Sequence, residues 1–280
     1  DKTQLGKLSS GIVQRLVQSY SPNPTGAFPE AQVHWHESGI GWQAVFAHHT
    51  ATGDGQFDDT VTGCLINGTY GTKADLLNGF DALSSMAGKW NDDIGWWGYA
   101  LARGMEIFKD AGMPQTKVKW SVPVVRTFNQ MNAQWDDQCG GGIYWSRNRQ
   151  ASADNQRLYK SSISNTLHIL LGARLYAATG NSTYKSLSDR TYDWLVSSKM
   201  IDASGLIHDG TNVGACGAIN RDTFSYTSGT MLSALGIFYQ KTKDEKYRQQ
   251  GAPLLAGALK AYVRNGILTE PCELTAEQCH

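Results

Sequence analysis

Apolar residues recur at intervals of three and four along most of the chain, the spacing that places side chains on one face of an α-helix. Near the start, Leu5, Leu8 and Ile12 follow this spacing, and residues 162–178 show it most clearly. The pattern predicts helices at residues 4–20, 33–47, 92–108, 118–135, 162–178, 184–198, 224–239 and 247–263. The sequence has no sustained two-residue alternation, so any strands should be short.

A short turn motif recurs between the predicted helices. Its copies occupy residues 52–54, 179–181 and, more loosely, 242–244, and each copy precedes an aromatic residue, at positions 57, 184 and 247. These aromatic positions are 127 and then 63 apart, so a missing copy is expected near residue 120. A period of about 63 residues fits a pair of helices with their connections, and weak repetition of helical hairpins is typical of an α/α array or toroid. We therefore expect an all-α fold, with residues 1–280 forming a single domain.

The charge balance narrows the class of partner. Lys plus Arg equals Asp plus Glu at 25 each, so the chain has no basic field for nucleic acid or an anionic membrane. No apolar run approaches the roughly 20 residues that span a bilayer, and no transmembrane segment is expected. Nine Trp and twelve Tyr favour an uncharged partner, although many of them must fill the core. We expect a monomer.

Five cysteines leave one unpaired if the others form disulfides. Cys272 and Cys279 are close in sequence, and Cys139 and Cys216 both adjoin glycine-containing segments that could meet in the fold. Cys64 is then the expected spare, a buried small apolar residue. No spacing matches a zinc or redox motif, so we expect neither a metal nor another cofactor.

Two features favour a secreted or cell-wall-associated protein. The chain begins at Asp1 instead of Met, which fits a mature secreted form or a trimmed chain. It also contains two glycosylation motifs, Asn67-Gly68-Thr69 and Asn181-Ser182-Thr183. Motifs this short often arise by chance, so they support secretion without establishing it.

The most informative stretch is Lys89 to Ala100, where Asp92 and Asp93 are adjacent at a predicted helix start. By pattern alone, residues 91–93 are more often a simple helix cap, because Asn and Asp side chains accept bonds from the first N–H groups. The flanking Trp90, Trp96 and Trp97 favour a sugar site, since aromatic faces stack on saccharides. Among these rings, two carboxyl groups should differ in proton affinity, as glycoside hydrolysis requires.

Several further motifs occur in a specific order along nearly the whole chain. They are Trp35 with Glu37 and Gly39, Asn91-Asp92-Asp93 with Trp97-Gly98, Trp135-Asp136 leading to Cys139-Gly140-Gly141-Gly142, Tyr159-Lys160 with Ile163-Ser164-Asn165, Ala173-Arg174-Leu175 with Thr179-Gly180-Asn181, Asp209-Gly210, Ser225-Tyr226 with Gly229, and Cys272-Glu273. This ordered set resembles glycoside hydrolase family 76, the α-1,6-mannanases, which include fungal members that attach mannoproteins to the cell wall.

The resemblance implies an (α/α)6-type barrel with the site at its mouth and α-1,6-mannan as substrate. It implies a retaining mechanism in which Asp92 attacks the anomeric carbon, while Asp93 protonates the leaving oxygen and then activates water. It also implies a set of substrate-binding residues: Trp35, Trp97, Trp145, Asn165, Asp209 and Tyr226. Asp209 and Tyr226 would contact mannose hydroxyls, whereas each of the others could equally belong to the core.

The sequence also departs from the family pattern. Six hairpins of about 63 residues need more than 280 residues, so either the last helices are absent and the barrel is incomplete at its C-terminus, or the ring closes with fewer helices. His36 and Ser161 replace a common Trp and a common Asn. Two other functions stay open beside the hydrolase: a transglycosylase that acts on the glycan of GPI-anchored proteins to link them to the wall, and a non-catalytic mannan-binding protein.

Overall fold

The computed structural model describes residues 2–31, 33–79 and 90–274. Most of these residues are helical, as the apolar spacing predicts. The chain forms two compact units, Asp1–Ala133 and Gln134–His280. The single domain expected over residues 1–280 stays a prediction.

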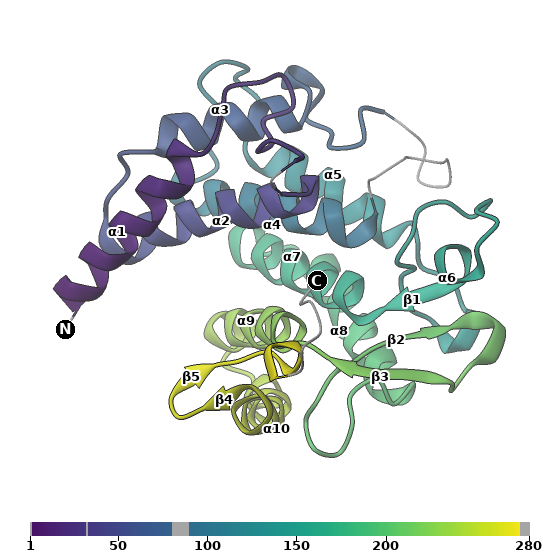
Figure 1. The fold of residues 1–280 in the computed structure, drawn as a ribbon. Coiled ribbons are helices and arrows are strands. Elements are labelled where there is room, and N and C mark those ends of the chain that lie inside the picture. The colour runs from purple at the N-terminus through teal and green to yellow at the C-terminus, as the bar shows by residue number, and fades with distance from the viewer. Residues whose placement is uncertain (1, 32, 80–89, 275–280) are drawn as a thin grey trace. The chain divides into compact units, whose positions relative to one another are not determined.

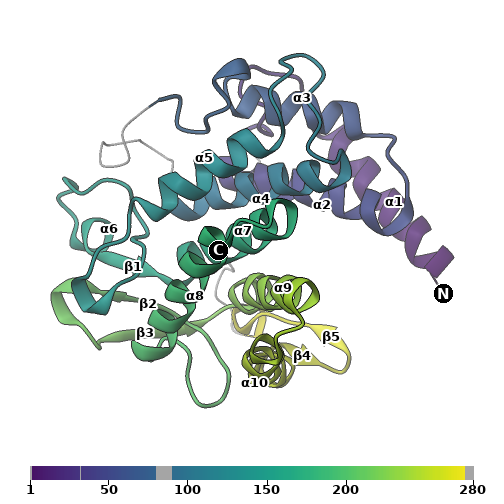
Figure 2. The same ribbon diagram turned by 180° about the vertical axis from the view of Figure 1, so that it is seen from behind.

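The first unit is built from packed helices (Figures 1 and 2). They are α1 (Lys2–Gln18), α2 (Trp35–Thr52), α3 (Asp58–Gly68), α4 (Asn91–Ile107) and α5 (Ser121–Asn132), with a short 3-10 turn η1 (Gly71–Lys73). Helix α4 packs along α2 on one side and α5 on another. Apolar side chains of α2 and α4 such as Trp42, Phe46 and Leu101 are buried in this unit.

Helix α3 was not predicted from the sequence. Its residues include β-branched Thr60, Val61 and Thr62 and two glycines, all of which have low helix propensity. Burial of Val61 and Leu65 stabilises the helix in spite of that propensity. Tertiary packing therefore decides the conformation here.

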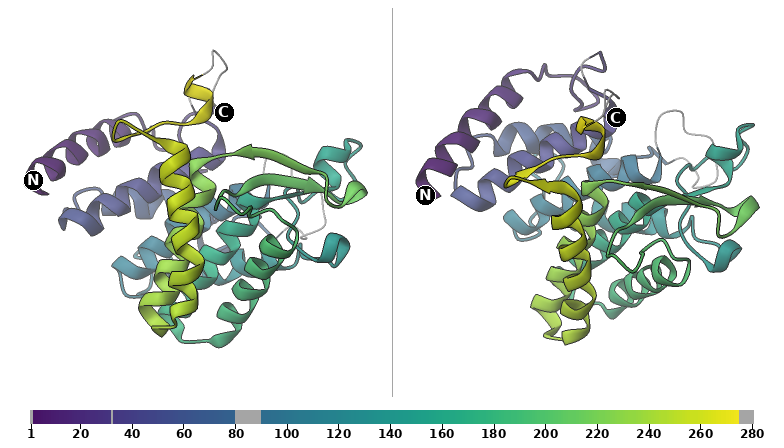
Figure 3. Two further views of the ribbon diagram at one scale, coloured as in Figure 1. Left: turned by 90° about the horizontal axis from the view of Figure 1, so that it is seen from below. Right: turned by 60° about the horizontal axis from the view of Figure 1, so that its bottom comes forward.

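The second unit combines helices with a small sheet (Figures 1 and 3). Its helices are α6 (Asp154–Arg157), α7 (Ser162–Thr179), α8 (Ser182–Ser197), α9 (Ser225–Thr242) and α10 (Glu245–Tyr262). Helix α7 is buried along most of its length and packs against both α8 and α9, while α10 packs on α9.

The strands are short, as expected. Strands β1 (Tyr159–Ser161), β2 (His208–Asn212) and β3 (Ile219–Thr223) form an antiparallel sheet in that order, and β4 (Val263–Arg264) pairs with β5 (Ile267–Leu268). The register of the sheet pairs Tyr159 with Asn212 and Thr211 with Ile219. This pairing brings together segments about 50 residues apart in sequence.

The recurring turn motif forms the same structure three times. Gly53, Gly180 and Lys243 end α2, α7 and α9 in the left-handed region, with φ of 79°, 72° and 58°. In each copy the following Asp or Asn side chain accepts a bond from the N–H two residues later, at 3.0 Å. The motif therefore stops one helix and starts the next. Near residue 120 the connection between α4 and α5 is built differently, around a bridge between Gly112 and Lys119.

The cysteines follow the predicted arrangement where the structure describes them. Cys139 and Cys216 form a disulfide, and Cys64 is a buried free thiol. Burial raises the pKa of Cys64 to about 11. Cys272 is also disulfide-bonded, and its predicted partner, Cys279, lies outside the described residues.

None of the helices among residues 2–31, 33–79 and 90–274 is both long enough and apolar enough to cross a membrane.

Candidate active site

The two adjacent carboxyl groups lie in the first turn of α4. Trp90 is the extended N-cap residue, with φ −108° and ψ 176°, so Asp92 and Asp93 are the second and third residues of the helix. Both side chains are half-buried, whereas Asn91 is fully buried. The positive end of the helix dipole stabilises carboxylates at these positions. Lys89 lies outside the described residues.

The two oxygens of Asp93 have different neighbours. Oδ2 accepts a hydrogen bond from the Trp90 N–H at 2.9 Å, which caps the helix. Oδ1 lies 3.6 Å from Nδ1 of His36, and the Asp93 side chain is only 14% exposed. Oδ2 of Asp93 therefore acts as a helix cap. Oδ1 lies beside the imidazole of His36, a group that can exchange protons.

His36 contributes no positive charge to this pair near neutral pH. Burial lowers the pKa of His36 below its ordinary value of 6.5, against the opposing effect of Glu37. The imidazole beside Asp93 is therefore mostly neutral at pH 7, and it does not force Asp93 to stay ionised.

Two of the predicted tryptophans stack on each other next to α4. The rings of Trp35 and Trp97 are 4.8 Å apart with an interplanar angle of 15°, and Nε1–H of Trp97 donates to the Trp35 carbonyl at 2.9 Å. Trp97 is fully buried, and a Cβ added at Gly39 or Gly68 would overlap it. Trp35 keeps part of its surface exposed. Trp97 thus supports Trp35 from the interior, and Trp35 is the ring that can meet a ligand.

In the second unit, Tyr159 connects two other predicted residues, Trp145 and Asp209. The Trp145 N–H donates to the Tyr159 carbonyl at 2.9 Å, and the two rings pack edge to face. The Tyr159 hydroxyl donates to Oδ2 of Asp209, which also accepts a bond from Asn220 at 3.2 Å. Burial raises the pKa of Asp209, with a smaller contribution from the negative charge of Asp222.

The link through Tyr159 was missed from the sequence. In the sequence Tyr159 belongs to a motif that assigns it no role, and Asn220 belongs to no motif. They meet Asp209 because β2 pairs with both β1 and β3. No local pattern could have shown this, since it depends on strand pairing across about 50 residues. A weak signal exists at Gly210, where any side chain would overlap the Tyr159 ring.

The remaining predicted residues differ in exposure. Asn165 is fully buried, and its amide bonds the N–H and carbonyl of Ile143, both at 2.9 Å, and the Ser161 carbonyl at 2.7 Å. These bonds hold the segment just before Trp145. Tyr226, at the start of α9, stacks on Phe224 and is 36% exposed. The Asn165 side chain therefore bonds backbone groups of the protein, whereas the Tyr226 ring is exposed to solvent and to a ligand.

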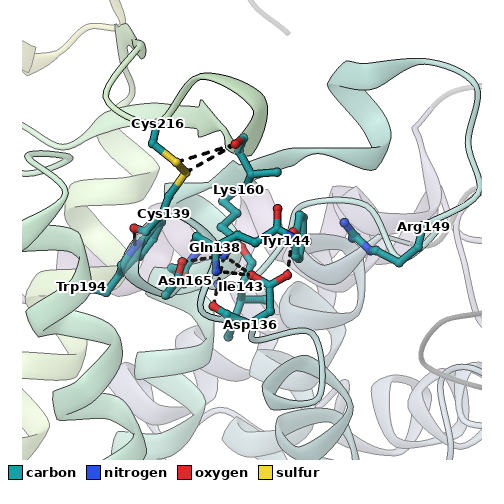
Figure 4. Close-up of polar contacts among 12 residues, drawn as sticks. Asp136, Gln138, Cys139, Ile143, Tyr144, Arg149, Lys160, Asn165, Trp194 and Cys216 are labelled. Carbon is teal, nitrogen blue, oxygen red and sulfur yellow. Dashed lines mark hydrogen bonds and ion pairs between the residues drawn. A yellow bond between two sulfur atoms is a disulfide. The ribbon is translucent and has the colours of Figure 1, made fainter.

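A buried lysine organises the loop that leads to Trp145 (Figure 4). Nζ of Lys160 donates to Oδ1 of Asp136 at 2.6 Å and to the carbonyls of Gln138 and Gly141 at 2.8 and 2.6 Å. The second oxygen of Asp136 accepts from the Tyr144 hydroxyl at 2.7 Å. Burial lowers the pKa of Lys160, and Asp136 opposes that shift. Because a buried charge is costly without partners, this set of bonds fixes the loop conformation.

Within the part of the chain that the structure describes, no group of three or more His, Cys, Asp or Glu side chains is placed to hold a metal ion.

The helices pair as hairpins, and two adjacent carboxyl groups lie in the first turn of α4, the helix that also carries Trp97, so the fold is that of an α/α-hairpin protein. The chain belongs to glycosyl hydrolase family 76, whose model matches residues 6–280. One relative is the mannan endo-1,6-α-mannosidase DCW1 of Candida glabrata, 26% identical over 241 residues, which are 85% of this chain and 52% of that protein. The chain thus spans about half the length of the curated relatives it matches.

Solved structures show the same fold. Dfg5 from Chaetomium thermophilum, in complex with glucosamine, has a TM-score of 0.84 and 25% identity, over 97% of this chain and 67% of that one. An inactive variant of the α-1,6-mannanase GH76A of Salegentibacter, in complex with α-1,6-mannotriose, has a TM-score of 0.72 and 18% identity, over 94% and 73% of the two chains. These similarities confirm the predicted all-α fold of the (α/α)6 type.

Proposed function

We propose that the protein is a retaining glycoside hydrolase that cleaves α-1,6-mannosidic linkages in mannan. The observation that carries this proposal is the adjacent, half-buried pair Asp92 and Asp93 in the first turn of α4. Family membership supports it, as does the name of the relative from Candida glabrata. In the inactive Salegentibacter variant, two consecutive aspartates are replaced by asparagine, and that protein holds an α-1,6-linked trisaccharide.

In the proposed mechanism, the carboxylate of Asp92 attacks the anomeric carbon as the bond to the leaving oxygen breaks. Asp93 gives its proton to that oxygen, which leaves a glycosyl ester on Asp92. Asp93 then takes a proton from water, the water oxygen bonds to the anomeric carbon, and Asp92 is released as a carboxylate. The helix dipole favours the ionised form of Asp92 between turnovers. His36 lies close enough to Asp93 to influence this proton transfer.

Replacement of each carboxyl group tests the assignment. Asp92→Asn should reduce hydrolysis of α-1,6-mannan to background, because no nucleophile remains. Asp93→Asn should lower the rate by about 10²- to 10⁴-fold, the usual contribution of a general acid. Added azide should then react with the glycosyl ester on Asp92 and give a glycosyl azide of retained configuration, measured by NMR.

A matched control is Asp59→Asn, since Asp59 also lies in the first turn of a helix but is exposed. Its activity should equal that of the unmodified protein. Full activity in a folded Asp92→Asn protein would remove the proposed mechanism. Background activity of the unmodified protein, together with binding of mannan, would instead favour the mannan-binding alternative.

We propose further that Trp145 and Asp209 contact saccharide, and that Tyr159 positions the Asp209 carboxyl group. Asp209→Asn should raise KM for mannan oligosaccharides about tenfold or more, since a hydrogen bond to a charged group contributes about 1.5–3 kcal/mol. The matched control is Asp59→Asn, which replaces an exposed carboxylate on α3. Equal KM values for both variants would contradict a contact at Asp209.

A transglycosylase is the second candidate because solved Dfg5 holds glucosamine, an amino sugar that is not a unit of α-1,6-mannan. Both activities use the same glycosyl ester and differ only in whether water or a sugar hydroxyl accepts the glycosyl group. Incubation of mannan with and without a glucan oligosaccharide separates them. A glucan-linked product detected by mass spectrometry would favour transfer, and mannose oligosaccharides alone would favour hydrolysis.

The proposed site of action is outside the cell or at the cell wall, with the chain acting as a monomer. The disulfide between Cys139 and Cys216 supports an oxidising compartment. Detection of the protein only in a reducing intracellular fraction would contradict this location, and a stable dimer in sedimentation measurements would contradict the monomer.

A further inference from the structure

The second unit has a groove that includes none of the residues proposed above for catalysis or substrate binding. Its volume is about 590 Å³, within the range of about 300–1,000 Å³ typical of small-ligand sites. One side is the segment that carries Trp135 and Gly140, and the other is α8. We refer to it as the α8 groove.

The wall formed by residues 135–142 is held in place by independent contacts. Lys160 bonds the carbonyls of Gln138 and Gly141, and Cys139 is joined to Cys216 (Figure 4). Nε1–H of Trp194, a residue of α8, donates to the Cys139 carbonyl at 3.1 Å. The wall is therefore attached directly to the helix that forms the opposite side. Because the groove is already formed, a ligand can bind without the loss of conformational entropy that ordering a flexible loop would require.

Glycines allow this wall to lie against two tryptophans. Gly141 and Gly142 have φ of 131° and 94°, and a Cβ at these positions would overlap Trp135 and Trp194 respectively. The two indole rings pack edge to face, with centroids 6.5 Å apart. Trp194 is buried behind the groove, and Trp135, which is partly exposed, is the ring that a ligand can contact.

The helix side supplies polar groups in a regular row. Ser186, Arg190, Asp193 and Ser197 follow the three- and four-residue spacing that places them on one face of α8, and all four are exposed. The guanidinium of Arg190 lies 3.9 Å from the centre of the Trp135 ring. The row therefore offers donors and acceptors to a ligand that also contacts aromatic surface.

The charges of the groove favour an uncharged ligand. The exposed carboxylate of Asp193 and the positively charged Arg190, three residues before it on α8, both line the groove. The third charged group, Asp189, is already bonded by Lys185, Lys246 and Tyr247. Saccharide hydroxyl groups suit this mixture, since they donate to carboxylates and accept from guanidinium, while the C–H surface of the sugar can contact the indole ring of Trp135.

We propose that the α8 groove is a second saccharide-binding site, specific for neutral sugar chains. The identity of its ligand as α-1,6-mannan rests on the proposed function, whereas its preference for a neutral saccharide does not. With mannan, the groove would hold the polymer to the protein independently of the carboxyl pair. Cleavage of long chains would then benefit from the groove, and cleavage of short oligosaccharides would not.

The experiment measures binding at the groove directly. The full chain carrying Asp92→Asn is titrated with an α-1,6-mannose oligosaccharide and, separately, with a β-1,3-glucan oligosaccharide. The backbone amide signals of Gly140, Ser186 and Ser197 are followed by NMR. We expect saturable shifts of all three amide signals with at least one of the two oligosaccharides. The oligosaccharide that binds more tightly identifies which polysaccharide the groove recognises. An oligosaccharide of glucuronic acid should give no shifts.

A double variant tests whether the polar row carries the binding. Arg190→Ala with Asp193→Ala should weaken binding at the groove at least tenfold and raise KM for long mannan severalfold, with turnover of a short oligosaccharide unchanged. The matched control is Arg248→Ala with Glu245→Ala, which removes the same number of charges from an exposed pair on α10.

The outcomes are separable from those of the proposed function. Absence of shifts at the three amides with both neutral saccharides would overturn the second site, even if mannan is cleaved. Stronger binding of the glucuronic acid oligosaccharide would also overturn it. Saturable shifts with the glucan in a protein that does not cleave mannan would support the groove and reject the hydrolase.

Discussion

His168 shows how a single buried residue links the fold to pH. It lies on α7 with no exposed surface, and its Nδ1 is 3.3 Å from the Thr191 hydroxyl. Burial lowers the pKa of His168 from 6.5 to about 3, and the nearby positive charge of Arg190 adds to the effect. The folded protein therefore keeps this ring neutral at pH values where the unfolded chain protonates it.

We predict that this residue makes the protein less stable in mild acid. Between pH 6.5 and about 3 the unfolded state binds the proton and the folded state does not. Above pH 6.5 this difference in proton binding does not reduce the free energy of unfolding. As the pH falls from 6.5 toward the folded pKa, the free energy of unfolding decreases by up to ~1.4 kcal/mol per pH unit. Urea unfolding at several pH values measures the slope, and His168→Gln should reduce it.

The control for this slope is His34→Gln. The His34 side chain is 74% exposed, so its replacement should leave the pH dependence of unfolding unchanged. A slope that is the same in both variants would show that other groups determine the acid sensitivity.

Single residues also mark the limit of interpretation from sequence. Asp92 and Asp93 stand out because they are adjacent and surrounded by tryptophans, which is a local pattern. Lys160 and Tyr159 do not stand out, because their partners lie about 20 and 50 residues away. The chemistry of a buried polar residue depends on those partners, and only the fold identifies them.

At the scale of helices and strands, apolar spacing is a reliable guide where one face is buried and the ends have clear signals. Helix α7 begins with a Ser161 side chain that bonds the Ser164 N–H and ends at Gly180, close to the predicted limits of 162 and 178. Helix α3 lacks such signals and contains poor helix formers. The sheet β1–β3 was not predicted as a sheet, because strands of three to five residues leave too short a pattern.

The three copies of the turn motif permit a matched prediction. Gly180→Ala should lower the free energy of unfolding by about 1 kcal/mol, because a side chain makes the left-handed region costly. Open space surrounds the site, so no steric overlap contributes. Lys243→Gly, at the equivalent position of α9, should raise stability by up to about 1 kcal/mol, less the entropy that glycine adds to the unfolded chain.

Gly236→Ala is the control for both changes. Gly236 lies inside α9, is exposed and has open space around it. Because alanine favours a helix interior by about 1 kcal/mol, this variant should be stabilised. Denaturant unfolding compares the three variants, and destabilisation by Gly236→Ala would show that the result at Gly180 does not arise from the left-handed conformation.

For the molecule as a whole, the sequence indicated the fold class and the family, because repeated hairpins and an ordered set of motifs extend over nearly the full chain. It did not reveal the division into units at residue 133. No change of composition accompanies that boundary, which arises from the density of contacts on each side. The α8 groove was also hidden, since it joins a helix face to a loop about 50 residues earlier.

The overall charge leads to a prediction about salt. The chain carries 25 positive and 25 negative side chains, and the proposed substrate is uncharged, so long-range attraction does not accelerate their encounter. We expect kcat/KM for mannan to change by less than about twofold over about a tenfold range of ionic strength. Steady-state rates across a salt series measure this. A steep fall with salt would indicate an anionic substrate instead.

The contact of Trp97 with Gly39 and Gly68 has a consequence for engineering substrate range. Any larger residue at positions 39 or 68 would displace the indole, and with it the partly exposed ring of Trp35 that stacks on it. Libraries intended to alter which sugar is accepted should therefore keep positions 39, 68 and 97 constant. Substitutions at position 35 alone would then change the side chain offered to the sugar, while Trp97 beneath it stays in place.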